Sequence, residues 1–172
     1  IPTPPQGFPS AALPKSSFDL FWNREANAAE AKLMIQAYRA SVSWTDWNIG
    51  RVLKALDDTG LREKTIVVLW GDHGWHLGEK TKYGKTDLWE ESDRVPFMVR
   101  VPGMTPANVK CDGVVNLLDM YPTLVELCGL PPNAENEGRS FVPLLKDPKM
   151  EWNHPTLTTY QFSNHSLTDG RY

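Results

Sequence analysis

The sequence contains only two cysteines, no long hydrophobic run and no large excess of charge of either sign. Cys111 and Cys128 can form one disulfide at most, and neither has partners at the spacing of zinc ligands. We expect Cys128, at the end of an apolar segment, to be a small buried residue. No apolar stretch is long enough to span a membrane. The net charge of -3 gives no reason to expect a nucleic-acid partner.

The composition is nevertheless that of a folded protein, because 41% of the 172 residues are hydrophobic and 23% are charged. The length suits one domain or part of a larger one. Residues 1–17, rich in Pro and Ser, predict an irregular arm, which should lie over something larger than this chain supplies. The opening residues have no signal-peptide character and no initial Met, which suggests a processed product or a piece of a longer protein.

Hydrophobic spacing predicts an alternation of helices and strands. Apolar residues recur every three or four positions over 27–58, which predicts a long helix that Gly60 ends. Apolar runs at 65–70 and 95–101 predict strands, the first buried on both faces. A second helix is expected over 119–128, then a turn with an apolar anchor at 138–145 and an edge strand at 156–162. This order predicts an α/β fold.

A polar, Gly-rich segment at 71–93 separates the two predicted strands, and loops of this length inside a domain usually carry function. Asp72 and His73 directly follow the first strand, at the end where α/β sheets bind ligands. A carboxylate oxygen and a ring nitrogen could ligate a metal, and Gly71 and Gly74 would let the backbone approach an ion or anion. Taken alone, the pair favours a plainer interpretation, in which Asp72 caps a turn and His73 makes a structural hydrogen bond.

The residues around this pair resemble the sulfatase family. A DHG-x-x-LGE stretch, a following lysine and an R-V-P-hydrophobic strand occur in the family's order, with further matches on both sides. In this chain the matching segments are Gly71 to Glu79, Lys82 to Lys85, Glu90 to Phe97, Tyr38 to Val42 with Asp46 and Gly50, Asp119 to Leu124, and Gly138 to Phe141. Trp75 and the Leu-Gly-Glu pattern make the resemblance look closest to the iduronate-2-sulfatase-like branch.

The resemblance implies part of an alkaline-phosphatase-like sandwich, with helices packed on a mixed, mostly parallel sheet. It divides the chain into the arm (1–17), the C-terminal portion of the α/β domain (18–145) and the start of a smaller C-terminal subdomain (146–172). It also implies a sulfuric ester hydrolase that acts on a sulfated carbohydrate in the periplasm, outside the cell or in lysosomes. The alternatives are a phosphate or phosphonate monoester hydrolase of the same superfamily and a non-catalytic domain that keeps the fold.

Position by position, Asp72 and His73 match the family's second pair of ligands for one divalent cation, usually calcium, with magnesium as the alternative. Because calcium prefers oxygen ligands, His73 is alternatively expected to contact the nucleophile or the sulfate. Lys85 matches the lysine that contacts the sulfate group, where an ammonium can neutralise charge that grows on the leaving oxygen. Outside this motif Lys85 would be taken for a solvated surface lysine. Lys85 and His73 are therefore the expected catalytic residues.

Trp75 and His76 are expected to bind substrate together with Lys85, as the subsite for the sugar. Packing over the loop explains Trp75 equally well, since aromatic rings serve both purposes. His76 and Glu79 have the spacing H-x-x-E, but we expect Glu79 to brace the loop through backbone hydrogen bonds rather than to hold a second metal.

Three further polar residues favour structural roles. Arg94 is expected to pair with Glu90 or Glu91 and to hold the loop against the sheet. His154 and His165, in the tail, match no motif and are expected at the surface or in caps.

Half of the family's site has no counterpart in the sequence. The nucleophile of sulfatases is a cysteine in C-x-P/S-x-R that is oxidised to formylglycine, and neither Cys111 nor Cys128 fits this pattern. The Asp-Asp pair that supplies the first metal ligands is also absent. We therefore expect formylglycine upstream of this chain, and the missing N-terminal part of the same enzyme as its partner. Alone, the chain is expected to be inactive and to bind metal weakly.

Overall fold

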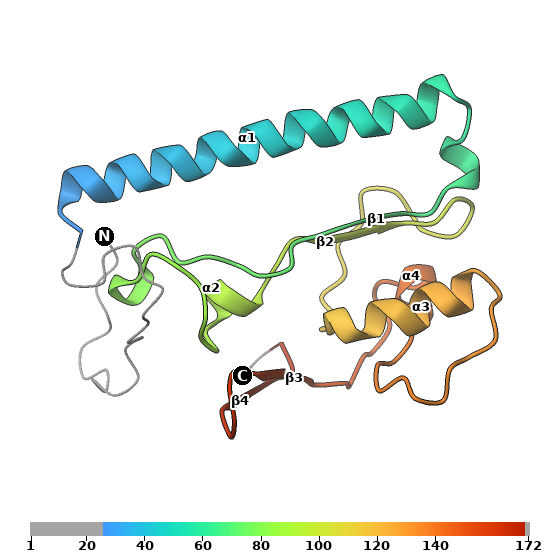
Figure 1. Cartoon of the computed structure of the whole chain (residues 1–172). Coiled ribbons are helices and arrows are strands. Elements are labelled where there is room, and N and C mark those ends of the chain that lie inside the picture. The colour runs from blue at the N-terminus through green and yellow to red at the C-terminus, as the bar shows by residue number, and fades with distance from the viewer. Residues whose placement is uncertain (1–25, 171–172) are drawn as a thin grey trace. The chain divides into compact units, whose positions relative to one another are not determined.

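The computed structural model describes residues 26–170, so the predicted arm at 1–17 lies outside the described residues. The first element is α1 (Ala28–Asp58), drawn in blue to blue-green in Figure 1. Asn27 begins this helix, since its side chain accepts from the N–H groups of Ala29 and Glu30, and its own N–H donates to the Glu30 carboxylate, all at 3.0 Å. Gly60, at a φ of 68°, follows the helix end. The helix predicted over 27–58 is confirmed.

The two predicted strands form β1 (Val67–Trp70) and β2 (Phe97–Arg100), which pair with each other in a two-stranded sheet. Pro96 precedes β2, and its carbonyl accepts from the N–H of Gly71 at 3.1 Å, so the connection reaches the first residue of the long loop. β1 was expected to be buried on both faces. In the described structure it is only half-buried, and Trp70 is 46% exposed.

The segment between these strands is more ordered than a plain loop. It contains a short 3-10 helix, η3 (Glu79–Thr81), and one turn of α-helix, α2 (Glu90–Asp93). Another 3-10 helix, η2 (Arg62–Lys64), precedes β1. The largest fully buried side chains in the described residues include three from this segment, namely His76, Lys82 and Tyr83. The segment therefore has its own small core, in which two of the three side chains are basic.

After β2, the 3-10 helix η4 (Leu117–Asp119) leads into α3 (Met120–Leu127), and α4 (Val142–Lys146) occupies the predicted apolar anchor. Thr123 joins them, because its hydroxyl donates to the Asp119 carbonyl at 2.6 Å and accepts from the Phe141 N–H at 3.0 Å. Phe141 is buried, as are Val142 and Leu144 of α4. The helix predicted at 119–128 is confirmed.

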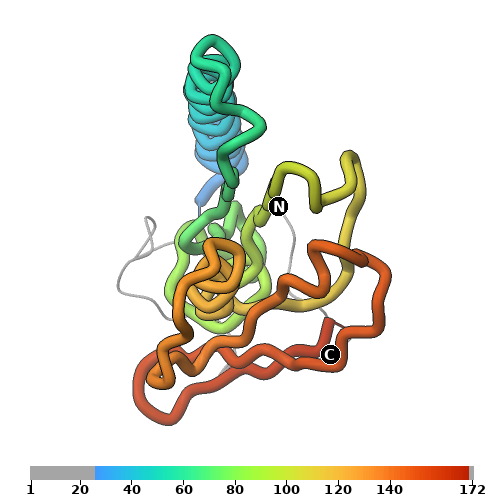
Figure 2. The backbone as a smooth tube through the Cα atoms, turned by 90° about the vertical axis from the view of Figure 1, so that its right-hand side faces the viewer, coloured from blue at the N-terminus to red at the C-terminus, as the bar shows by residue number. Residues whose placement is uncertain are grey.

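The chain then forms a hairpin from β3 (Thr156–Thr159) and β4 (His165–Thr168), visible in red in Figures 1 and 2. The strands are antiparallel, with Thr156 opposite Thr168. The expected edge strand at 156–162 is therefore confirmed in its first half, while β4 was not predicted.

By their contacts the described residues divide into two compact units, one of residues 26–64 and 69–97, the other of residues 65–68 and 98–170. The loop with the predicted site lies in the first unit. The domain boundary expected between residues 145 and 146 stays a prediction.

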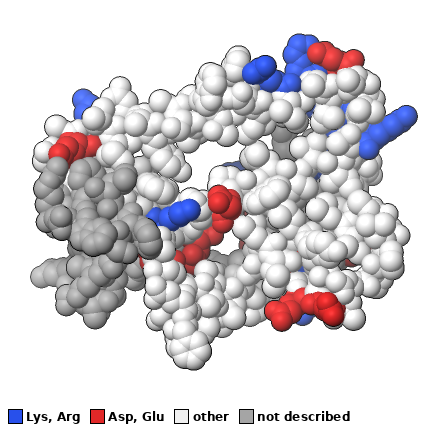
Figure 3. All heavy atoms as spheres, viewed as in Figure 1, with Lys and Arg blue, Asp and Glu red and all other residues white. Residues whose placement is uncertain are grey.

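Several expectations about the surface can be compared with residues 26–170. Within this range no helix combines the length and the apolar character that a membrane span needs. On the face in Figure 3, acidic and basic side chains are interspersed. Cys111 and Cys128 are free and exposed. The expected burial of Cys128 is wrong, because this residue caps the end of α3 beside Gly129, whose φ is 62°.

Candidate functional site

The segment 71–94 is folded back on itself by backbone hydrogen bonds. The N–H of His76 donates to the Gly84 carbonyl at 2.7 Å, and the N–H of Gly78 donates to the Lys82 carbonyl at 2.9 Å. These bonds close a compact loop over residues 76–84. Lys85 follows immediately, so its backbone is fixed on one side by the closure of this loop.

Gly74 fastens the start of the segment to α2. Its N–H donates to the Ser92 carbonyl at 2.7 Å, and a Cβ at this position would lie 2.1 Å from the Glu91 carbonyl oxygen. Only glycine permits this approach. We expected Gly74 to bring the backbone close to an ion or anion; the described structure instead brings it against another backbone segment.

Asp72, His73 and Lys85 come together, although the last two are twelve positions apart in the sequence. Nζ of Lys85 contacts Nε2 of His73, and the nearer Asp72 carboxylate oxygen lies 3.6 Å from the same nitrogen. Nδ1 of His73 is 2.8 Å from the Gly74 carbonyl, an acceptor, so Nδ1 carries the proton and Nε2 accepts from the Lys85 ammonium. The Asp72 side chain is 84% exposed and that of His73 33%, which leaves this cluster open to a ligand.

Asp72 and His73 are the two side chains in this cluster that could ligate a divalent cation. A separation of 3.6 Å between a carboxylate oxygen and Nε2 is one that a single cation can bridge. Nε2 has one lone pair, however, so it binds either the Lys85 ammonium or a cation. Among residues 26–170 no group of three or more His, Cys, Asp or Glu side chains could hold a metal. The residues present therefore fit one part of a metal site and need further ligands.

The two aromatic residues after Gly74 differ in exposure. Trp75 is half-buried, with its ring centroid 6.3 Å from that of His73. His76 is fully buried, with Nδ1 3.2 Å from the Glu79 carbonyl and Nε2 3.1 Å from an Asp87 carboxylate oxygen. The predicted substrate contact of His76 therefore needs correction, because a ring enclosed inside the loop does not reach a ligand at its surface.

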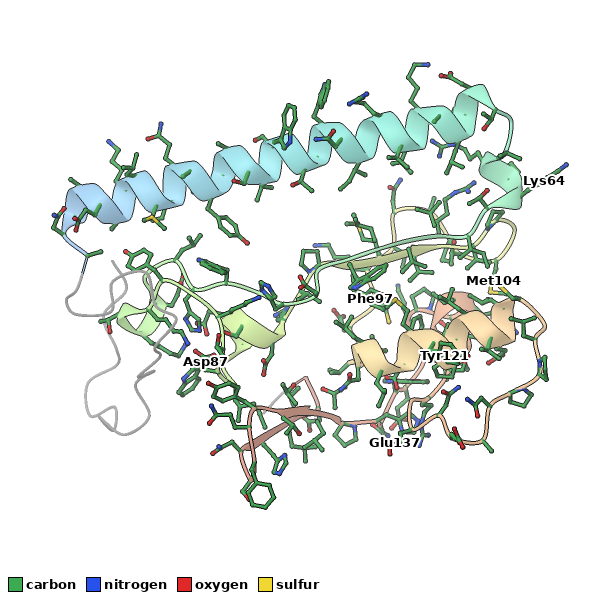
Figure 4. All side chains as sticks on the ribbon, in the orientation of Figure 1. Lys64, Asp87, Phe97, Met104, Tyr121 and Glu137 are labelled. Atoms are coloured by element: carbon green, nitrogen blue, oxygen red, sulfur yellow. The ribbon has the colours of Figure 1, made fainter. Side chains whose placement is uncertain are left out.

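Asp87, labelled in Figure 4, was not singled out from the sequence, yet it lies at the centre of the loop's polar core. Its carboxylate accepts from Nζ of Lys82 at 2.8 Å and from the N–H of Trp89 at 3.0 Å, in addition to facing His76. Burial raises the pKa of Asp87, but the hydrogen bonds from His76 and Lys82 outweigh burial, so its pKa lies well below the usual range. Neither hydrophobic periodicity nor the spacing of motif residues predicts that His76, Lys82 and Trp89 meet at Asp87.

Glu79 and Arg94 are the two residues expected to stabilise the loop. Glu79 accepts from the N–H of Leu77 at 2.6 Å, so its predicted bracing role is confirmed. Arg94 pairs with Glu90 at 2.6 Å, as predicted, but both side chains are at least 70% exposed and lie one turn apart on the same segment. This pair therefore does not hold the loop against the sheet.

Glu91 pairs with Lys80 instead, at 2.7 Å, and Nζ of Lys80 also lies 4.6 Å from the centroid of the Trp89 ring. This second ion pair links η3 to α2 within the same loop. It shares no side chain with the Asp87 network.

The downstream segments that matched the family have structural roles here. The Asp119 carboxylate accepts from the N–H of Arg139 at 2.7 Å, and a Cβ on Gly138 would lie 2.2 Å from the Leu118 carbonyl oxygen. His154 contacts Arg139 at 3.0 Å, and His165 contacts Thr159 at 2.9 Å. These contacts fix the anchor and the hairpin.

Comparison with known proteins agrees with the resemblance of the motifs. A sequence model described as Sulfatase matches residues 8–130. The chain is 41% identical over 141 residues to a sulfatase of Formosa agariphila, an alignment that covers 82% of this chain and 28% of the relative. It is 38% identical over 120 residues to iduronate 2-sulfatase of Mus musculus, covering 56% of this chain and 22% of the relative. The chain thus spans about a quarter of the length of these relatives.

Among solved structures, the chain is similar to a protein in complex with its substrate D-glucosamine-2-N,6-O-disulfate. The TM-score is 0.70 at 25% sequence identity, and the match covers 76% of this chain and 29% of that one. This likeness confirms the predicted α/β class of the alkaline-phosphatase-like type. From its motifs, its fold and its relatives, the chain belongs to the sulfatase family.

Proposed function

We propose that the protein to which this chain belongs hydrolyses sulfate esters, and that the chain contributes Lys85, His73 and Asp72 to the site. The contact of Lys85 with His73, beside the exposed Asp72 carboxylate, carries this proposal. An ammonium group, a ring nitrogen and a carboxylate thus lie together within the residues that match the sulfatase family.

Lys85 suits a role in recognising the sulfate group. Its ammonium has three N–H donors, of which one is directed to His73, so the others remain available for sulfate oxygens. As the bond between sulfur and the leaving oxygen breaks, negative charge grows on that oxygen. A fixed ammonium next to it stabilises this charge more in the transition state than in the substrate.

Asp72 and His73 are the residues that would hold a divalent cation, for which we propose calcium. When bound, the ion would supply positive charge to neutralise the sulfate oxygens. A carboxylate oxygen and an imidazole nitrogen are both suitable ligands, and the protonated Nδ1 of His73 leaves Nε2 as the atom that would coordinate the ion. With the ion on Nε2, the Lys85 ammonium would give up its bond to His73 and direct its N–H donors to the sulfate oxygens. The further ligands and a formylglycine nucleophile are proposed to lie upstream of this chain, since no C-x-P/S-x-R occurs in it.

We further propose a sulfated sugar as the substrate. Trp75, half-buried and close to His73, offers a flat apolar surface of the kind on which a sugar ring packs. The similar solved structure was determined with a sulfated glucosamine as its substrate, which supports the same class here.

The experiment is to measure aryl sulfate and aryl phosphate turnover by the full-length protein and by its Lys85→Ala variant. We expect a preference for the sulfate ester and a loss of about 10²- to 10³-fold in kcat/KM on removing the ammonium. Lys80→Met, a lysine of the same loop that pairs with Glu91, is the matched control and should retain activity. A preference for phosphate, or equal activity of Lys85→Ala and the unaltered protein, would contradict the proposal.

A further inference from the structure

Asp87 joins three parts of the loop through one carboxylate. It contacts His76 from the start of the loop, Lys82 from the segment after η3, and the N–H of Trp89 at the beginning of α2. The three side chains are almost completely enclosed, with exposures of 0% for His76, 1% for Lys82 and 13% for Asp87. Asp87 is thus the point at which the two ends of the loop are held together.

Lys85 lies between the residues that this network fixes. On its N-terminal side, the Gly84 carbonyl is bonded to the N–H of His76. On its C-terminal side, Thr86 has a φ of 83°, which a β-branched residue seldom adopts, and its carbonyl is 3.5 Å from Nζ of Lys82. The surroundings must hold Thr86 in this conformation, and Asp87 is the next residue.

The Asp87 network also connects the backbone around Lys85 to the backbone around His73. His76, whose ring faces Asp87, is three residues after His73, whose ring faces Lys85. The carboxylate therefore ties the backbone that carries His73 to the backbone that carries Lys85. A lysine has a long and flexible stem, so the position of its ammonium depends on such backbone support.

Stability alone does not require this arrangement. Enclosing charged groups costs desolvation, and apolar side chains of similar volume often close a loop as well or better. What a hydrogen-bonded charge network adds is a fixed geometry, because each partner must meet the others at a set distance and direction. A small displacement of a group that contacts the reacting atoms has a large effect on rate.

We propose that Asp87 is a positioning residue for the sulfate-ester site, which fixes the backbone on either side of Lys85, and so the place of its ammonium beside His73, through its contacts with Lys82 and His76. The inference rests on the proposed function, since it assigns to Asp87 an effect that passes through Lys85. Asp87 itself contacts neither the sulfate nor the cation in this assignment.

The test is a double-mutant cycle in the full-length protein with Asp87→Asn, Lys85→Ala and the two combined. Three quantities are measured for each variant: kcat and KM on an aryl sulfate, and the affinity for inorganic sulfate, which needs no turnover. Asp87→Asn alone should weaken sulfate binding and lower kcat by about 10- to 100-fold. In the Lys85→Ala background the same change should have an effect of less than about twofold, because the group that it positions is gone.

Glu91→Gln is the matched control, because it breaks the other ion pair of the loop and leaves the hydrogen bonds of Asp87 in place. It should keep sulfate affinity and turnover even where its melting temperature falls as far as that of Asp87→Asn. If Asp87→Asn does not fold, Lys82→Met takes its place in the same cycle and should give the same non-additive pattern.

The outcomes separate the two proposals. Equal fold-losses from Asp87→Asn in both backgrounds overturn the positioning role while leaving the proposed function standing. A Lys85→Ala variant with unchanged sulfate affinity and turnover overturns the proposed function, and the positioning role with it.

Discussion

Gly74 is the residue at which the smallest addition should have the largest structural effect. An alanine methyl group would lie 2.1 Å from the Glu91 carbonyl oxygen, which belongs to backbone and cannot rotate away. We expect Gly74→Ala to lower the free energy of unfolding by about 1–3 kcal/mol, the usual cost of overpacking. Chemical denaturation of the protein measures this change.

Gly50→Ala serves as the control. Gly50 lies inside α1 with nothing within 4 Å of the position of an added Cβ. Because alanine favours a helix over glycine by up to about 1 kcal/mol, this variant should be as stable as the original protein or more stable. Equal effects at the two glycines would contradict the close approach at Gly74.

Asp87 should make the protein sensitive to acid. Its pKa is depressed in the folded state, so it adds stability above its unfolded pKa of about 3.9 and loses this contribution as the pH falls toward the folded pKa. Asp87→Asn should therefore flatten the decline of unfolding free energy between about pH 5 and pH 3. Denaturation series at several pH values measure the slope. An unchanged slope in Asp87→Asn would show that the carboxylate is not stabilised as its contacts indicate.

At the scale of elements, α1 shows what a sequence can specify by local rules. The apolar spacing, the Asn27 cap and the left-handed Gly60 each depend only on residues a few positions away in the chain. The hairpin of β3 and β4 shows where prediction from local rules fails. Its connection places Gln161 and Ser163 at positive φ, a conformation that neither residue type favours, so the sequence does not predict β4.

The site residues show the same contrast: those in a local motif could be predicted from the sequence, and those that depend on distant contacts could not. Asp72, His73 and Lys85 could be named in advance because each stands at a fixed place in a motif, and the structure brings them together. Asp87 and the burial of His76 could not, because they depend on how the loop closes on itself. Charged residues such as Lys82 are normally exposed, so nothing in the sequence indicates an exposure of 1%.

Thr123 gives a prediction for the contact between α3 and the anchor that precedes α4. Its buried hydroxyl both donates to Asp119 and accepts from Phe141. Thr123→Val keeps the shape but removes this acceptor, which should cost about 1–3 kcal/mol of unfolding free energy. Thr159→Val, on the exposed side of β3, is the control, since water replaces its bond to His165. Thermal unfolding compares the two; similar losses would contradict the role of Thr123.

At the scale of the whole molecule, the distribution of apolar side chains matches the small share of a sulfatase that this chain represents. Among the 31 residues of α1 only Ala31 is buried in the described structure. Trp44 and Trp47 stack on each other with ring centroids 5.1 Å apart, yet are 65% and 54% exposed. The relatives that the chain matches are several times longer, and the chain covers 28% of the Formosa agariphila sulfatase.

The activity of the 172-residue chain by itself follows from the composition of its site. Asp72 and His73 supply two possible metal ligands, and residues 26–170 contain no group of three or more His, Cys, Asp or Glu side chains that could hold a metal ion. The sequence also has no cysteine in C-x-P/S-x-R. We therefore expect the purified chain to turn over no aryl sulfate above the buffer rate, with or without calcium. The readout is product release at high protein concentration, with the full-length protein as the positive control. Turnover by the chain that Asp72→Asn abolishes would mean that these residues form a complete site, and that the nucleophile must be sought within the chain.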